Sequence, residues 1–230
     1  MNIFKYFYHI LFKNGLHFVP NPVEHIFIFK EWKTINQSNK NLLELKLPWI
    51  TVSAKNKIVD YLTKIKNPKV FEYGVGGSSL FFVDKGASLI SIEHDYEWYL
   101  KLMNIKLNTK SNWQILNIPP GTKTHHRLYG SSFRGYENSD FLNYVTSIDS
   151  FEDSSFDLIL IDGRSRVACL KHAKSKVKLG GWIVLDNAER SRYFEEDILV
   201  EPEFKSIYDH YGALIGSFQF VKTNIYQRIK

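Results

Sequence analysis

The sequence predicts one α/β domain with a doubly wound, mainly parallel sheet, preceded by a shorter extension. Three observations predict this fold class. Short apolar segments alternate with helix-like segments from residue 51 onward, a glycine-rich turn follows the first apolar segment, and two apolar segments near residue 230 are joined by a turn too short for a crossover helix. Such alternation requires βαβ units with helices on both faces of the sheet. We assign residues 1–50 to an extension of helices and loops and residues 51–230 to the domain.

Composition is that of a globular protein, with 44% hydrophobic residues in a chain of 230. The single cysteine, Cys169, excludes an internal disulfide and is typical of a reducing compartment, so we expect a cytoplasmic protein. The net charge of +6 arises entirely within residues 1–66, which contain ten lysines and four acids. These lysines are scattered and no basic stripe with interleaved aromatic residues is present, so nucleic acid is not an expected partner.

The extension begins with apolar residues at helical spacing from Ile3 to Leu11, and Asn14-Gly15 predicts the end of this helix. The helix has two possible positions. It packs on its own domain, which we favour, or it lies on a membrane surface or a partner subunit, a second copy of the chain included. The rest of the extension is expected to be irregular because Pro20 and Pro22 interrupt it.

The domain's elements follow in order. Ser53 predicts the cap of a helix that ends at Asn67-Pro68. The expected strands are 69–73, 88–93, 113–118, 156–162, 182–186, 204–208 and 217–229. The expected helices end at residue 85 after the first strand, cover 96–107 after the second and cover 166–177 after the fourth. Gly180-Gly181 is expected to stop the last helix, and the long segment 119–139 to form a lid or binding loop.

The first chemical signal is the run from Glu72 to Ser79, EYGVGGSS, at a strand-to-helix turn. Glycines at such a turn let the backbone bend sharply and approach a ligand without Cβ interference. Glu93 ends the next strand, where a carboxylate can accept hydrogen bonds from both ribose hydroxyls. Together they predict a site for a nucleoside-containing ligand.

These residues resemble the first motif of the class I S-adenosylmethionine-dependent methyltransferases, an acid followed after one residue by Gly-x-Gly, and the resemblance covers about three quarters of the chain. It implies a Rossmann-like fold with S-adenosylmethionine as cofactor. The acid would reach the methionine ammonium, the turn would lie under the cofactor, and Glu93 would bind the ribose beside His94. The residues implied to bind the cofactor are Glu72, Gly74, Gly76, Gly77, Ser78, Glu93, His94 and Asp162. The expected antiparallel strand pair near the C-terminus is also similar to the extra strand of that family.

Two alternatives remain. A nicotinamide or sugar-nucleotide enzyme could use a similar sheet, but Ser79 stands where its fingerprint needs a third glycine, and Glu72 would repel a pyrophosphate. A non-catalytic scaffold could keep the fold and present the basic, aromatic extension to a partner.

The second signal lies at two other strand ends. Asp162 ends the fourth strand, and Asp186-Asn187 ends the fifth, so their oxygens should converge and suit Mg²⁺. This arrangement resembles the metal site of catechol-type, cation-dependent O-methyltransferases, which implies these three residues as ligands. Acids at strand ends also cap helices or bind cofactors. The sequence departs from that family at Ser165, where catechol-type enzymes carry a lysine suited to taking the hydroxyl proton.

Arg164 and Arg166 follow the fourth strand and would suit a clamp on a carboxylate or phosphate, although surface salt bridging is equally compatible. We therefore expect a small, anionic acceptor, such as a uronate, a phosphorylated sugar or an acidic metabolite, methylated at oxygen. The candidate catalytic residues are Asp162, His94 and Arg164. The adjacent histidines at positions 125 and 126 are further candidate bases.

Overall fold

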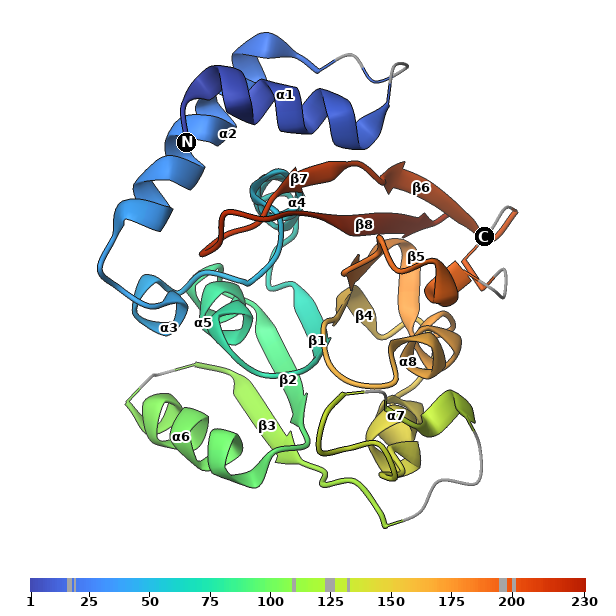
Figure 1. The fold of residues 1–230 in the computed structure, drawn as a ribbon. Helices are drawn as coiled ribbons and strands as arrows, with labels where there is room; N and C mark the ends of the chain where they lie inside the picture. The colour runs from blue at the N-terminus through green and yellow to red at the C-terminus, as the bar shows by residue number, and fades with distance from the viewer. Residues whose placement is uncertain are drawn as a thin grey trace.

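The computed structural model describes residues 1–15, 18, 20–108, 111–122, 127–131, 133–194, 198–199 and 202–230. A mixed sheet with strand order β3-β2-β1-β4-β5-β8-β6 forms its centre, and β7 pairs with β8 (Figure 1). The strands are β1 (Lys69–Tyr73), β2 (Ser88–Glu93), β3 (Trp113–Asn117), β4 (Phe156–Ile161), β5 (Val177–Asp186), β6 (Phe204–Tyr208), β7 (Tyr211–Ala213) and β8 (Phe220–Arg228). The pairs among β1 to β5 are parallel, and β8 runs antiparallel to β5, β6 and β7. The predicted fold class, including the C-terminal antiparallel pair, is confirmed.

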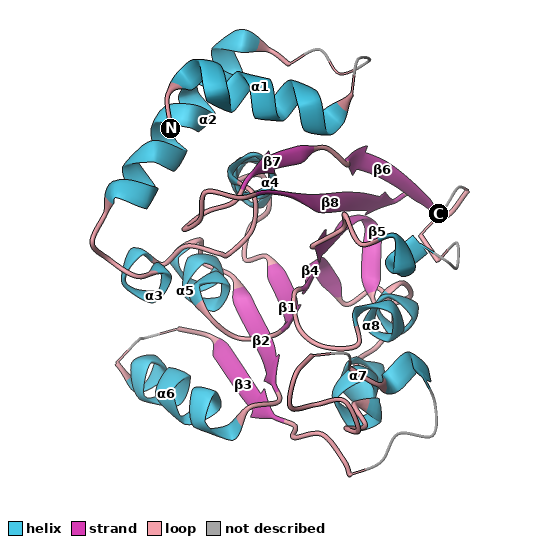
Figure 2. Ribbon diagram, in the orientation of Figure 1, coloured by secondary structure: helices cyan, strands magenta, loops and turns pink. Residues whose placement is uncertain are grey.

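Helices cover both faces of the sheet, which appears in magenta between them (Figure 2). The helices are α1 (Ile3–Asn14), α2 (Pro22–Gln37), α3 (Leu42–Leu45), α4 (Val52–Leu62), α5 (Gly77–Asp84), α6 (Tyr96–Leu107), α7 (Leu142–Thr146) and α8 (Arg166–Ala173). Short 3₁₀ turns lie at η1 (Arg127–Tyr129), η2 (Ser147–Ser150) and η3 (Ser191–Phe194). Among the described helices, none combines the length and the apolar character needed to span a bilayer.

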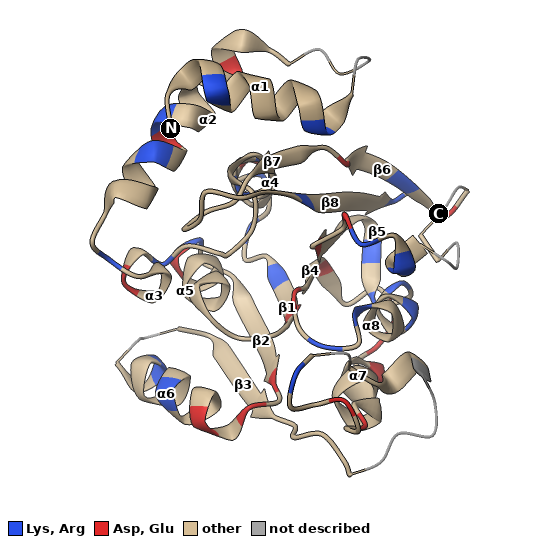
Figure 3. Ribbon diagram, in the orientation of Figure 1, with Lys and Arg blue, Asp and Glu red and all other residues tan. Residues whose placement is uncertain are grey.

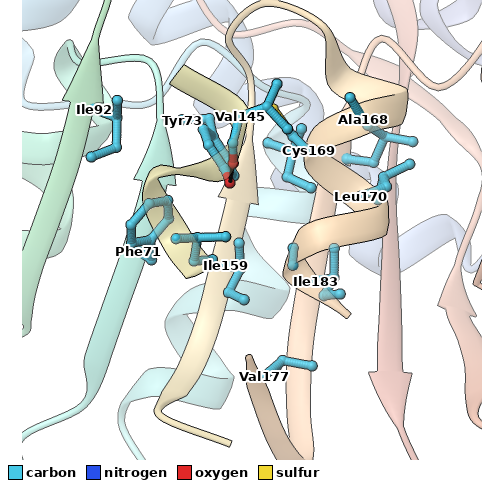
Figure 4. Close-up of a cluster of buried hydrophobic side chains, with 14 of the residues drawn as sticks. Phe71, Tyr73, Ile92, Val145, Ile159, Ala168, Cys169, Leu170, Val177 and Ile183 are labelled. Carbon is cyan, nitrogen blue, oxygen red and sulfur yellow. Dashed lines mark hydrogen bonds between the residues drawn. The ribbon is translucent and has the colours of Figure 1, made fainter. Parts of the chain in front are cut away.

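Alternation along β1 separates the two cores. Phe71 and Tyr73 pack with α7 and α8 in one cluster of buried side chains, part of which Figure 4 shows around Cys169. Val70 faces the opposite side, with residues of α4, α5 and α6. Glu72 lies on that second side, so its carboxylate is buried within an apolar layer.

Several predicted boundaries are wrong for local reasons. The cap of α4 is Thr51, whose hydroxyl accepts from the Ala54 amide, and Ser53 is buried inside the helix. Helix α8 ends at Ala173, and β5 already begins at Val177. Gly180-Gly181 therefore lies inside the strand, beside an irregularity in the β4–β5 register.

The extension is more ordered than expected. Pro22 does not interrupt it but occupies the first turn of α2, and Asn21 accepts hydrogen bonds from two amides there. Helix α1 matches its predicted start and end, and it packs on its own domain as favoured: Tyr6 and Ile10 are buried in a cluster with Trp32 and residues of β7. In Figure 1, α1 and α2 lie beyond β7, at the end of the molecule opposite α6.

Candidate functional site

The glycine turn joins β1 to α5, and its glycines are required for different reasons. Gly74 has a φ of 96°, and a Cβ there would lie 3.4 Å from the backbone of Gly163 after β4. A Cβ on Gly77 would collide with the carbonyl oxygens of Leu47 and Leu42, because α3 packs against the first turn of α5. A Cβ on Gly76 would meet no atom within 4 Å. Gly76 is thus the glycine of the turn that borders open space.

Glu72 is fully buried beneath this turn. Its carboxylate accepts hydrogen bonds from Ser78 Oγ at 2.8 Å, from Ser91 Oγ at 2.6 Å and from Ser79 Oγ. Burial raises the pKa of Glu72 to about 7, although the three serine hydrogen bonds lower it. The buried group therefore ionises only near neutral pH, and its predicted contact with a methionine ammonium stays a prediction.

Ser91 is not predicted from the sequence, and Ser79 is named there only as a departure from the dinucleotide fingerprint. A usable signal existed for Ser91, which is the polar residue between Ile90 and Ile92 of β2 and is paired in register with Glu72. A buried acid on one strand needs hydroxyl donors on its neighbour.

Glu93, at the end of β2, connects the glycine turn to the segment before α6. Its carboxylate accepts from the Val75 amide at 3.2 Å and from the amides of His94 and Asp95, both at 2.8 Å. The indole of Trp98 donates to the Val75 carbonyl at 2.7 Å, which fixes α6 to the same turn. The turn is therefore held from two directions by residues following β2.

His94 lies between Glu93 and Arg164. Its Nδ1 is 2.7 Å from Glu93 Oε1, and Arg164 Nε donates to its Nε2 at 3.3 Å. Because an arginine Nε–H can only donate, Nε2 must accept, and the ring proton resides on Nδ1, facing Glu93. The contact sets the tautomer in which the Nε2 lone pair accepts from Arg164.

Arg164 is half-buried and lies against aromatic rings. Its guanidinium carbon is 3.8 Å from the Phe133 ring centroid and 5.5 Å from that of Tyr136. In the described part of the chain, it forms no ion pair with a carboxylate. The cation is held in place while its charge remains available to an anion.

Arg166 has a different role from the clamp predicted. Its guanidinium bonds Asp162 Oδ1 at 2.8 Å, lies 3.6 Å from Asp186 Oδ2, and donates to the backbone carbonyls of Asp162, Gly163 and Asp186. Asp186 also accepts from Thr223 Oγ1 at 2.8 Å. Burial raises the pKa of both aspartates, and the arginine opposes this. Arg166 is an internal brace that ties the end of β4 to the end of β5.

The predicted Mg²⁺ site does not fit this arrangement. The guanidinium of Arg166 occupies the position between the Asp162 and Asp186 carboxylates that a divalent cation would need, and it neutralises them. Half-buried Asn187 follows at the turn after β5 with a φ of 53°. Across the described ranges, no group of three or more His, Cys, Asp or Glu side chains is placed to hold a metal ion. The metal prediction is therefore not supported.

Of the other residues predicted from the sequence, Asp162 lies at the site, and two histidines fall outside the described residues. Asp162 has a side chain 27% exposed, which makes it the acid of this strand edge most accessible to a ligand. His125 and His126 lie outside the described residues. Tyr144, which no sequence pattern indicated, is fully buried beside Gly163, and its hydroxyl has no hydrogen-bond partner among the residues that the structure describes.

Comparison with known proteins gives matches in structure alone. No family model matches the chain, and no curated protein matches its sequence. Magnesium protoporphyrin IX methyltransferase from Synechocystis, solved with S-adenosylmethionine, is similar with a TM-score of 0.51 and 11% identity over 93% of this chain and 100% of that one. A methyltransferase-like protein from Silicibacter pomeroyi is similar with a TM-score of 0.51 and 15% identity over 77% and 85%. TrmN from Thermus thermophilus is similar with a TM-score of 0.50 and 10% identity over 74% and 48%.

These likenesses, at such low identity, establish the architecture. The chain has the fold of the class I S-adenosylmethionine-dependent methyltransferases, including the antiparallel strand inserted beside β5. The carboxyl ends of β1, β2 and β4, where ligands bind in open α/β sheets, carry the residues described above.

Proposed function

We propose that the protein is an S-adenosylmethionine-dependent methyltransferase that methylates an oxygen of a small, anionic acceptor. The observation that carries the proposal is the connected edge of the sheet. The turn at Gly76 opens to free space, and the adjoining Glu93, His94 and Arg164 form one chain of contacts beside it. The similarity of this fold to that of S-adenosylmethionine-dependent methyltransferases also supports the proposal.

The electrostatics of the turn favour a cationic donor over a dinucleotide. The carbonyl oxygens of Leu42 and Leu47 lie at the first turn of α5, where a pyrophosphate would otherwise bind, and Glu72 is buried directly beneath it. These groups disfavour a diphosphate and suit a sulfonium or ammonium. In this proposal the Glu72 carboxylate acts on the donor through the field it creates and through Ser78.

The acceptor side is assigned to His94 and Arg164. When bound, S-adenosylmethionine supplies a methyl group that the acceptor oxygen attacks while the carbon–sulfur bond breaks and its electron pair returns to sulfur. Once Arg164 turns from His94 to the acceptor, the Nε2 lone pair is free to take the acceptor's hydroxyl proton, and Glu93 stabilises the resulting imidazolium. Arg164, held by Phe133, pairs with the acceptor's anionic group. Asp162 borders the donor and is oriented by Arg166.

Binding tests the donor first. Calorimetric titration should show binding of S-adenosylmethionine and S-adenosylhomocysteine and none of NAD. Gly76→Ala is the sharpest variant, because its methyl group meets no protein atom and the fold should be retained. We expect an unchanged melting temperature with loss of donor binding. An Ala variant that binds the donor as the wild type does would remove the donor from this turn.

Transfer of labelled methyl groups tests the acceptor. Arg164→Gln should raise KM for an anionic acceptor by about 10- to 100-fold, the effect of losing one charge-assisted contact. The KM for an uncharged analogue of the same acceptor should change little. The matched control is Arg134→Gln, which removes a charge from an exposed residue next to Phe133, in the segment between β3 and α7. Equal effects of the two variants would contradict the acceptor assignment. Donor binding without transfer to any acceptor would favour the scaffold instead.

A further inference from the structure

Helix α1 presents a second apolar face that its own domain leaves uncovered. Phe4 is 82% exposed, Phe12 70%, Tyr8 61% and Leu11 45%. Residues 4, 8 and 12 follow one another at intervals of four, and Leu11 lies in the same row, so they line one side of the helix. Tyr8 and Phe12 stack with their ring centroids 5.8 Å apart. The face is a regular aromatic row on a formed helix.

The opposite side of α1 is already occupied, so this row cannot turn inward. Tyr6 packs against Trp32 and Phe220, with ring centroids 6.1 Å and 5.8 Å apart. Asn14 exchanges two hydrogen bonds with the backbone of Tyr211 on β7, at 3.1 and 2.7 Å. The helix is anchored along its length, and rotating it to bury the outer row would expose the inner one.

The charge of the N-terminal segment indicates which kind of partner the outer face of α1 binds. Residues 1–23 contain Lys5 and Lys13 and no Asp or Glu, and both lysines are exposed. Figure 3 shows α1 with basic positions and no acidic one. The excess positive charge of the chain falls within residues 1–66, while the remainder is neutral overall.

We propose that the outer face of α1, defined by Phe4, Tyr8, Leu11 and Phe12, binds an anionic lipid surface, with Lys5 at the headgroups, whereas Lys13 lies over the Tyr211 ring on the side that faces β7. Aromatic and leucine side chains enter the boundary between headgroups and acyl chains, and lysines beside them add attraction to anionic lipids. A symmetric dimer through the same face would find no acid on α1 to pair with Lys5. This inference is independent of the proposed catalytic function.

Sedimentation with vesicles tests the proposal. The full chain should sediment with phosphatidylcholine vesicles that contain phosphatidylglycerol, and much less with phosphatidylcholine alone. The double variant Phe4→Ser/Phe12→Ser should weaken binding by at least about tenfold, since it removes two large apolar insertions. Lys5→Glu should weaken the preference for anionic lipid, and Lys13→Glu, on the side of α1 that faces β7, should change it less. The matched control is Leu107→Ser/Leu179→Ser, which replaces two leucines of comparable exposure on α6 and β5.

The variants change exposed side chains, so melting temperatures should match the wild type and a loss of binding cannot be ascribed to unfolding. Three results would overturn the proposal. The wild type could remain in the supernatant with anionic vesicles, the Phe variant could bind as well as the Leu control, or light scattering could show a dimer that only Phe4→Ser/Phe12→Ser dissociates. The last would assign the face to a second copy.

Discussion

Glu72 makes the stability of the domain depend on pH in a direction opposite to that of most acids. Its pKa is raised from an ordinary 4.5 to about 7 because the carboxylate is fully buried. Below pH 4.5 the group is protonated in both folded and unfolded chains. As pH rises from 4.5 to 7, the unfolded chain releases the proton first, so the free energy of unfolding falls, and above 7 the loss is complete. The separation of the two pKa values corresponds to about 3 kcal/mol.

Replacing Glu72 with Gln removes the ionisation and keeps the shape. The amide can still accept from the serine hydroxyls and can donate to one of them after that hydroxyl rotates. Relative to the wild type, Glu72→Gln should therefore gain about 2 to 3 kcal/mol of stability between pH 5 and pH 8, whatever its stability at pH 5.

Urea unfolding followed by tryptophan fluorescence at pH 5, 6, 7 and 8 measures this difference in free energy. Glu152→Gln, which removes an exposed acid from a loop, is the control and should show almost no pH-dependent difference. If the stability difference between Glu72→Gln and the wild type were the same at pH 5 and pH 8, the carboxylate would be ionised throughout this range, and the reasoning from burial would be refuted.

Three other perturbations follow from contacts at the site. Gly77→Ala should destabilise the fold by about 3 kcal/mol in urea unfolding, because its methyl group must displace α3; stability like that of Gly76→Ala would show that α3 gives way freely. Arg166→Ala should cost about 3 to 5 kcal/mol, with the largest loss above neutral pH, where Asp162 and Asp186 would ionise without their shared cation. EDTA should leave both the melting temperature and the methyl transfer of the wild type unchanged, and a loss of either on chelation would restore the metal site.

The sheet was predictable because its central strands are buried on both faces and therefore form apolar runs between helical segments. β1, β2 and α6 lie where the sequence placed them. The extension was less predictable, because its proline and polar residues are typical of interruptions between helices. Asn21-Pro22 instead begins a helix, and the buried face of α2 becomes apparent only when Trp32 is seen to donate to the Leu214 and Ser217 carbonyls, about 180 positions along the chain.

The site residues illustrate the limit more sharply. Arg164 and Arg166 are two residues apart and chemically identical, so the sequence assigned both to one clamp. The turn into α8 sends Arg166 inward, between the ends of β4 and β5, and Arg164 outward, onto Phe133. The same turn explains why the predicted metal site does not form. The Arg166 side chain already neutralises the two aspartates that were expected to bind the metal. Acids at strand ends indicate that the edge of the sheet needs a compensating positive charge. Only the packing of the following helix determines whether a metal, a ligand or the protein's own arginine supplies that charge.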